Sequence, residues 1–197
     1  MTGITSNPRR LKGAPSRPRF YRAPCLHGLL LLCLLCQMPV SWAKGVYQAP
    51  QDFLQEIFGG KPPPPQTLWI TREIGEGARA ILGHPLRLMR AHYWTQGERS
   101  VWILEEIGKE QPITLGIVIK ANHVEQMRVL IYRESRGDEV RQPFFLDQFK
   151  GAGLRDGDKL DRAIDGVSGA TLSTRALTKL ARLALFLDRQ RNAHGSP

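Results

Sequence analysis

At Leu86 the hydrophobic pattern of this chain changes from helical spacing to alternation. Alternating apolar and polar residues, in runs rich in Val, Ile, Trp and Tyr, are typical of β-strands. Four such runs follow one another, separated only by short polar turns, at residues 86–94, 100–108, 113–121 and 124–133. Consecutive strands joined by tight turns pair in opposite directions, so the sequence predicts an antiparallel meander.

Helical segments precede these strands. Residues 53–58 form a short amphipathic segment, and the two glycines and four prolines after it favour an extended spacer. The pattern leaves open whether this segment docks on the domain or on a partner. Residues 71–83 place apolar side chains at helical spacing and end in a glycine, which predicts a second helix.

Two further helices are predicted after the strands. Residues 142–151 are rich in Phe and predict a short helix, whereas residues 173–191 place apolar side chains along one face of a long amphipathic helix. We expect Arg175, Lys179 and Arg182, on its other face, to be solvated. Strands in the middle with helices at both ends make an α+β fold, an antiparallel sheet meander with flanking helices and a C-terminal amphipathic helix.

The first 43 residues have the layout of a signal peptide. Residues 1–24 contain six basic residues and no acidic one. They are followed by an apolar run at 26–35 and by a small-x-small triplet that ends at Ala43. This layout predicts export to the periplasm, with cleavage after Ala43. The apolar run is shorter than the about 20 residues that a membrane-spanning helix needs, so an uncleaved membrane anchor is the second reading.

The excess of basic charge lies largely in this signal peptide. It contains six of the 28 basic residues and none of the 18 acidic residues, so 22 basic residues remain against 18 acidic ones. The remaining charges alternate in sign, and we expect no nucleic-acid partner. The three cysteines, Cys25, Cys33 and Cys36, also lie in the signal peptide. The exported chain then has no thiol for a disulfide or a structural zinc site, and we expect no metal.

Residues 165–174 read DGVSGATLST and lie at the start of the predicted C-terminal helix. Three kinds of site use small and hydroxyl residues in this way. In a phosphate-binding turn Ser173 or Thr174 would cap the helix, but a helix terminus contributes only about 0.3–1 kcal/mol per charge. A serine nucleophile is disfavoured, because the segment contains neither G-x-S-x-G nor S-x-x-K. The third kind is covalent attachment of a group through a hydroxyl.

Residues 165–171 resemble the flavinylation motif of the FMN-binding domain family, which occurs in the C subunit of the sodium-pumping NADH:quinone oxidoreductase and in the G subunit of the Rnf complex. In that family the threonine of Ser-Gly-Ala-Thr carries FMN as a phosphoester, which a flavin transferase installs from FAD outside the cytoplasm. The resemblance implies that Thr171 is the attachment residue. It also implies cofactor-binding roles for Asp165, Ser168, Gly169, Ala170 and Ser173.

The resemblance extends upstream and covers about residues 113–187. Glu134 and Ser135 lie where the family has a Glu-Thr-Pro-Gly turn, which implies that this turn contacts the cofactor. Ser135 and Arg136 depart from the family pattern, which often has Thr and Pro there. Four aromatic residues are expected to be core or cross-strand partners and not site residues, as aromatic residues in strands mostly are: Trp69, Trp94, Trp102 and Tyr132.

The sequence therefore predicts a signal peptide at 1–43, a short helix and proline-rich linker at 44–66, an FMN-binding domain at 67–190 and a tail at 191–197. The resemblance implies an exported flavoprotein with covalent FMN, a redox carrier without catalytic residues of its own. Its partners would be the flavin transferase and membrane-associated redox donor and acceptor proteins. Two alternatives remain: an exported binding or scaffold domain without flavin, and an enzyme that reduces a small acceptor directly.

Overall fold

The computed structural model describes residues 45–194. The signal peptide expected at 1–43 and the last three residues of the expected tail lie outside these described residues. Within the described part of the chain, no helix has both the length and the hydropathy that crossing a bilayer requires.

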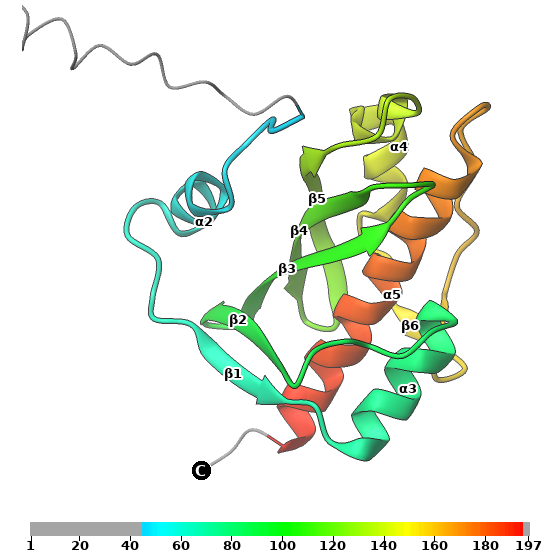
Figure 1. Cartoon of the computed structure of the whole chain (residues 1–197). Coiled ribbons are helices and arrows are strands. Elements are labelled where there is room, and N and C mark those ends of the chain that lie inside the picture. The colour runs from blue at the N-terminus through cyan, green and yellow to red at the C-terminus, as the bar shows by residue number, and fades with distance from the viewer. Residues whose placement is uncertain (1–44, 195–197) are drawn as a thin grey trace, which may run out of the picture. The chain divides into compact units, whose positions relative to one another are not determined.

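The strands form a five-stranded sheet in the order β1-β2-β3-β4-β5, and every neighbouring pair is antiparallel (Figure 1). The α+β fold and the antiparallel meander are therefore confirmed. Strand β1 was not predicted, because its four residues follow the proline run and are too few to show alternation. The strands are β1 (Gln66–Trp69), β2 (Arg90–Gln96), β3 (Arg99–Ile107), β4 (Pro112–Lys120) and β5 (His123–Tyr132).

Helices cover both faces of the sheet, as Figure 1 shows. Helices α3 (Arg72–Leu82) and α5 (Thr171–His194) lie on one face, where Leu180 of α5 and Trp102 of β3 belong to the same buried core. Helix α2 (Pro50–Phe58) lies on the other face. Because β4 is covered on both sides, its sequence is a nearly continuous apolar run and does not alternate.

Helix α2 docks on its own domain, which answers the question that its sequence left open. The Phe53 ring fits against β4 at Gly116, where a Cβ would lie only 2.4 Å from the ring. Arg128 of β5 adds a hydrogen bond of 2.6 Å to the Glu56 carboxylate. The buried cluster beneath the helix contains Phe53, Leu54, Val101, Val118 and Leu130.

Between β5 and α5 the chain forms short helices and a small hairpin. The Phe-rich segment folds as α4 (Pro143–Leu146) and the 3-10 helix η2 (Asp147–Phe149), after another 3-10 helix, η1 (Asp138–Arg141). A two-stranded sheet of β6 (Leu154–Arg155) and β7 (Lys159–Leu160) follows. We did not predict this hairpin, because strands of two residues show no period.

Helix α5 differs from its prediction at both ends and along its charged face. It begins at Thr171 and continues to His194, so residues 191–194 extend the helix and do not form the expected tail. Arg182 is not solvated as expected. Its guanidinium donates hydrogen bonds to the carbonyl and the carboxylate of Asp158, at 2.6 and 2.7 Å, because the β6–β7 turn lies over this part of the helix.

We expect Phe53→Ala to lower the free energy of unfolding by about 3–5 kcal/mol, because it leaves a cavity between α2 and the sheet. Urea unfolding of the purified protein measures this change. The matched control is Phe144→Ala in α4, whose ring is 64% exposed. The control should change the free energy of unfolding by less than about 0.5 kcal/mol. Equal effects of the two substitutions would contradict the docking of α2 on the sheet.

Candidate functional site

Three segments that are distant in the sequence enclose a groove of about 600 Å³. The first is the turn between β3 and β4, at residues 109–110. The second follows β5, at residues 134–136, and the third is residues 169–173 at the start of α5. Six of the eight predicted site residues line this groove: Glu134, Ser135, Gly169, Ala170, Thr171 and Ser173.

The other two predicted site residues, Asp165 and Ser168, do not line the groove. Both are exposed on the loop that leads to α5. The backbone N–H of Asp165 donates to Gln148 Oε1 at 2.7 Å, and Gln148 Nε2 donates a longer bond of 3.5 Å to the Asp165 carbonyl. Gln148, in η2, therefore holds the start of the motif. Sequence analysis missed this residue, because no local pattern marks a contact across that loop.

A tight turn leads into α5. The N–H of Ala170 donates to the carbonyl of Val167 at 3.0 Å, and Gly169 has a φ of 78°, a left-handed conformation that favours glycine. Helical bonding begins at once, because the N–H of Thr174 donates to the Ala170 carbonyl at 2.9 Å. Ser173 and Thr174 therefore lie inside the first turn and do not cap the helix. The Thr174 hydroxyl instead accepts the N–H of Val167 at 3.4 Å.

The small size of Ala170 is required by the turn that packs behind it. Thr171, the first residue of α5, is exposed, whereas its neighbour Ala170 is buried. A Cβ at Gly137 would lie 3.1 Å from the Ala170 Cβ, so the two backbones approach closely. A side chain larger than alanine at position 170 would push this turn away. Gly169 and Ala170 thus form part of the groove lining, and Thr171, which follows them, remains exposed.

Tyr132 of β5 joins two sides of the groove. Its Oη donates to the carbonyl of Arg136 at 2.6 Å, so the Ser173 hydroxyl, at 2.9 Å, donates its own proton to Tyr132 Oη. Burial raises the pKa of Tyr132, although the hydrogen bond with Ser173 opposes this effect. The phenol therefore stays protonated at neutral pH. We assigned Tyr132 to the core alone, but it also connects the 134–136 segment to α5.

Glu134 holds the opposite wall of the groove in place. Its Oε1 accepts the backbone N–H groups of Lys109, Glu110 and Gln111, at 2.5, 2.7 and 3.0 Å. Burial raises the pKa of Glu134, but these three hydrogen bonds outweigh burial and lower the pKa overall. The carboxylate is therefore ionised at neutral pH and is used to hold the β3–β4 turn beside α5.

The groove has the properties needed to hold an anionic cofactor with a large ring. Its volume lies in the range of about 300–1,000 Å³ that is usual for small-molecule sites. The first N–H groups of α5 have no acceptor within the helix and favour a phosphate. Thr171 offers a hydroxyl at the same point. The residues of the groove therefore fit FMN.

The groove is also lined by four residues that were not predicted to be site residues. Arg136 is exposed and adds a cation, and Lys109 pairs with Glu110 at 3.2 Å. Leu172 adds exposed apolar surface. No motif marks Lys109 and Glu110, because their place beside Thr171 depends on how the strands and α5 pack, whereas Arg136 and Leu172 adjoin predicted site residues in the sequence.

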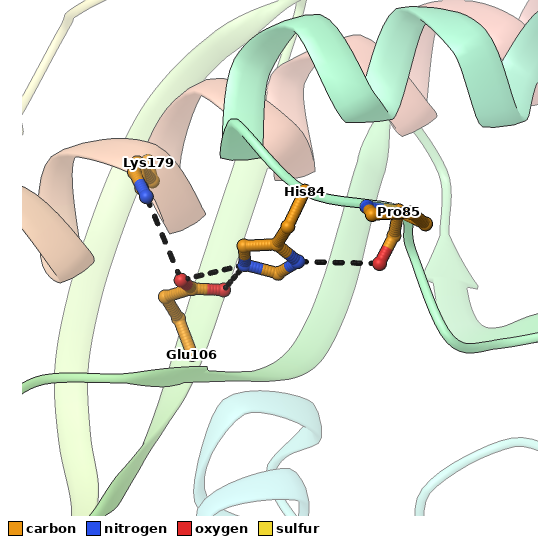
Figure 2. Close-up of polar contacts among 4 residues, drawn as sticks. All are labelled: His84, Pro85, Glu106 and Lys179. Atoms are coloured by element: carbon orange, nitrogen blue, oxygen red, sulfur yellow. Dashed lines mark hydrogen bonds and ion pairs between the residues drawn. The ribbon is translucent and has the colours of Figure 1, made fainter. Parts of the chain in front are cut away.

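A second polar cluster lies outside the groove, in the loop that follows α3 (Figure 2). His84 Nε2 lies 3.0 and 3.2 Å from the two carboxylate oxygens of Glu106, and His84 Nδ1 lies 3.2 Å from the carbonyl of Pro85. Both partners only accept, so the ring donates to both when it is protonated on both nitrogens. Lys179 Nζ also approaches the buried Glu106, at 3.7 Å. Within residues 45–194, no three or more His, Cys, Asp or Glu side chains are placed to hold a metal ion.

We expect the His84–Glu106 contact to make stability depend on pH. The hydrogen bond with Glu106, followed by that with Pro85, raises the pKa of His84, while burial and Lys179 lower it less. A raised pKa in the folded state means that the contact stabilises fully below the unfolded value of about 6.5 and is lost as pH rises through the folded pKa. The difference in free energy of unfolding between wild type and His84→Gln should therefore shrink with rising pH.

Urea unfolding at a series of pH values from acid to mildly alkaline measures this difference. His92→Gln is the matched control, since the His92 ring contacts only the Thr67 hydroxyl among the polar contacts of the described residues. A wild-type to His84→Gln difference that stays constant across the series would contradict a charged His84–Glu106 pair.

Tyr132→Phe should lower the free energy of unfolding by about 1–3 kcal/mol. It removes the donor to the Arg136 carbonyl and leaves the buried Ser173 hydroxyl without its acceptor. Urea unfolding measures the loss. Ser168→Ala, at an exposed position of the same loop, should change stability by less than about 0.5 kcal/mol. A neutral Tyr132→Phe would show that the phenol does not join the two walls.

Comparisons with known proteins agree with the fold. Residues 108–185 match the model of the FMN-binding domain, and this segment contains every residue that lines the groove. No curated protein matches the chain. Among solved structures, the crystal structure of Shewanella oneidensis NqrC is similar, with a TM-score of 0.51 and 17% identity over 71% of this chain and 88% of that chain. At this identity the likeness shows a shared fold. Residues 108–185 of the chain therefore match the FMN-binding domain, the family that the motif at 165–171 resembles.

Proposed function

We propose that this protein is an exported flavoprotein that carries FMN covalently on Thr171 and transfers electrons between partner proteins. One observation carries the proposal: an exposed threonine begins α5 at the edge of a groove, and the whole groove lies within the segment that matches the FMN-binding domain. The alternative of a flavin-free scaffold leaves this open groove and its exposed hydroxyl without a role.

The attachment is a transfer of the FMN part of FAD to the threonine. The Thr171 oxygen forms a bond to the flavin-side phosphorus, the pyrophosphate bond breaks, AMP leaves, and the hydroxyl proton passes to a base of the flavin transferase. A threonine hydroxyl is a weak nucleophile at neutral pH, so that enzyme has to activate it. The exposed position of Thr171, next to Gly169, supports access by a second protein.

The residues of the groove position the cofactor. The N–H groups at the start of α5 favour negative charge and would hold the phosphate. Arg136 and Leu172, which also line the groove, offer a cation and an apolar surface. Glu134, through Oε1, and Tyr132, through Oη, keep these walls together. When bound, FMN supplies the redox chemistry, and the protein supplies position and electrostatics.

Covalent attachment suits a carrier that works outside the cytoplasm. A flavin held at a micromolar Kd, about −8 kcal/mol, dissociates from a dilute protein, whereas a phosphoester does not. The signal peptide expected at 1–43 supports a periplasmic location. The open groove leaves the cofactor near the surface, where redox donor and acceptor proteins, including membrane-associated ones, can approach it.

Thr171→Ala should abolish covalent flavin when the protein is produced together with a flavin transferase, because no oxygen remains to form the phosphoester. Intact-mass measurement reports the FMN increment and signal-peptide cleavage together. Thr171→Ser, which keeps the hydroxyl, should retain the increment at least in part, and Thr67→Ala, which removes an exposed threonine hydroxyl outside the groove, should retain it fully. An FMN increment on Thr171→Ala protein would falsify the assignment, and so would wild-type protein without the increment.

A further inference from the structure

Three exposed apolar side chains gather where β1 ends and β2 begins. Trp69 is 62% exposed, Leu88 is 48% exposed and Met89 is 83% exposed. The N–H of Ile70 donates to the carbonyl of Met89 at 3.1 Å, which places the loop before β2 directly beside the end of β1. Single exposed apolar residues are common on protein surfaces, but three at one junction form a patch.

Two arginines flank these apolar side chains. Arg90 lies opposite Trp69 in the antiparallel pair, and Arg87 precedes Leu88. Both are exposed, and neither guanidinium has a hydrogen bond or an ion pair among residues 45–194. Residues 84–97 contain no Asp or Glu that could neutralise them. We call Trp69, Arg87, Leu88, Met89 and Arg90 the Trp69 patch.

The loop that carries this patch is held at both ends. Its first part is attached to β3 by the contact between His84 and the buried Glu106 (Figure 2). Leu86 packs against the main core, and Met89 is hydrogen-bonded through its carbonyl to Ile70. The side chains of Leu88 and Met89 are therefore presented by a fixed backbone.

We propose that the Trp69 patch docks the protein on the surface of a membrane that contains anionic lipids. Exposed aliphatic side chains gain by entering the outer edge of the hydrocarbon, and a tryptophan favours the level of the headgroups. Arginines extend from that level to lipid phosphates, and each adds attraction to an anionic surface. The patch thus combines the apolar and the cationic components that interfacial binding requires.

Two features of the patch disfavour other occupants. In a symmetric contact with a second copy, the same patch would face itself, and unpaired Arg87 and Arg90 of both copies would repel. A protein partner would need a hollow that fits the projecting Met89 side chain. A fluid interface of lipids adapts to such a shape without a preformed hollow, so it is the occupant that the patch favours.

Quenching of Trp69 by brominated lipids tests the proposal on the chain without the signal peptide expected at 1–43, because the basic and apolar residues of that peptide would bind anionic vesicles themselves. The emission of wild-type protein minus that of Trp69→Phe isolates this residue, because the rest of the chain is identical in both proteins. With vesicles of brominated phosphatidylcholine and phosphatidylglycerol, we expect the Trp69 emission to fall about twofold or more when the bromines lie near the headgroups. With brominated phosphatidylcholine alone, we expect little quenching.

Charge reversal provides the second readout. The double substitution Arg87→Glu and Arg90→Glu should weaken binding to anionic vesicles. The lipid concentration needed for half-maximal quenching of Trp69 should rise about tenfold or more. The matched control is Phe144→Ser, which removes an exposed apolar ring elsewhere and should leave the quenching unchanged. Absence of Trp69 quenching on anionic vesicles overturns the proposal. Equal quenching of Trp69 in wild type and in the double arginine variant overturns it as well. Emission of Trp69 that changes with protein concentration without lipid assigns the patch to a second copy and also overturns it.

Discussion

The packing of α5 across the sheet holds together the three segments that form the groove. Leu177, Leu180 and Ala184 of this helix are buried in the core that also contains Trp102 and Leu115 of the central strands. Because the helix is held along its length, its first residue has a defined position relative to the ends of β3 and β5. Thr171 is thus placed by apolar burial far from the groove, and the polar contacts around the groove only adjust the walls.

Two polar contacts make this adjustment in different ways. Glu134 binds three backbone N–H groups of the β3–β4 turn, which would otherwise be free to move away from α5. Tyr132 connects the following segment to Ser173 and leaves no buried polar atom of this joint without a partner. Both residues use their polar groups on the protein itself. The surfaces of Arg136, Leu172 and Thr171 consequently remain for a cofactor.

The groove and the Trp69 patch divide the surface between two tasks. The groove has an exposed threonine hydroxyl at its edge, at the point where we propose that a cofactor is attached. The patch has two unpaired arginines around apolar side chains and no built pocket, which suits a weak and reversible contact. Helix α2, on the outer face of the sheet, covers the central strands but leaves Trp69 exposed, so the same domain can bury a core and still present an apolar surface.

Periodicity and local motifs were sufficient to predict the four strands of the meander and the long C-terminal helix, although β2 begins at Arg90 and not at Leu86, and α5 begins at Thr171 and not at Ser173. These features depend on residues that are close in sequence, so their signal is local. Strand β1 and the β6–β7 hairpin carried no such signal, because they are too short to show a period. The roles of Lys109, Gln148, Arg136 and Tyr132 could not be read from the chain either. Those residues meet the motif only after the strands and α5 bury their apolar faces together, and contacts between distant segments leave no pattern in a single sequence.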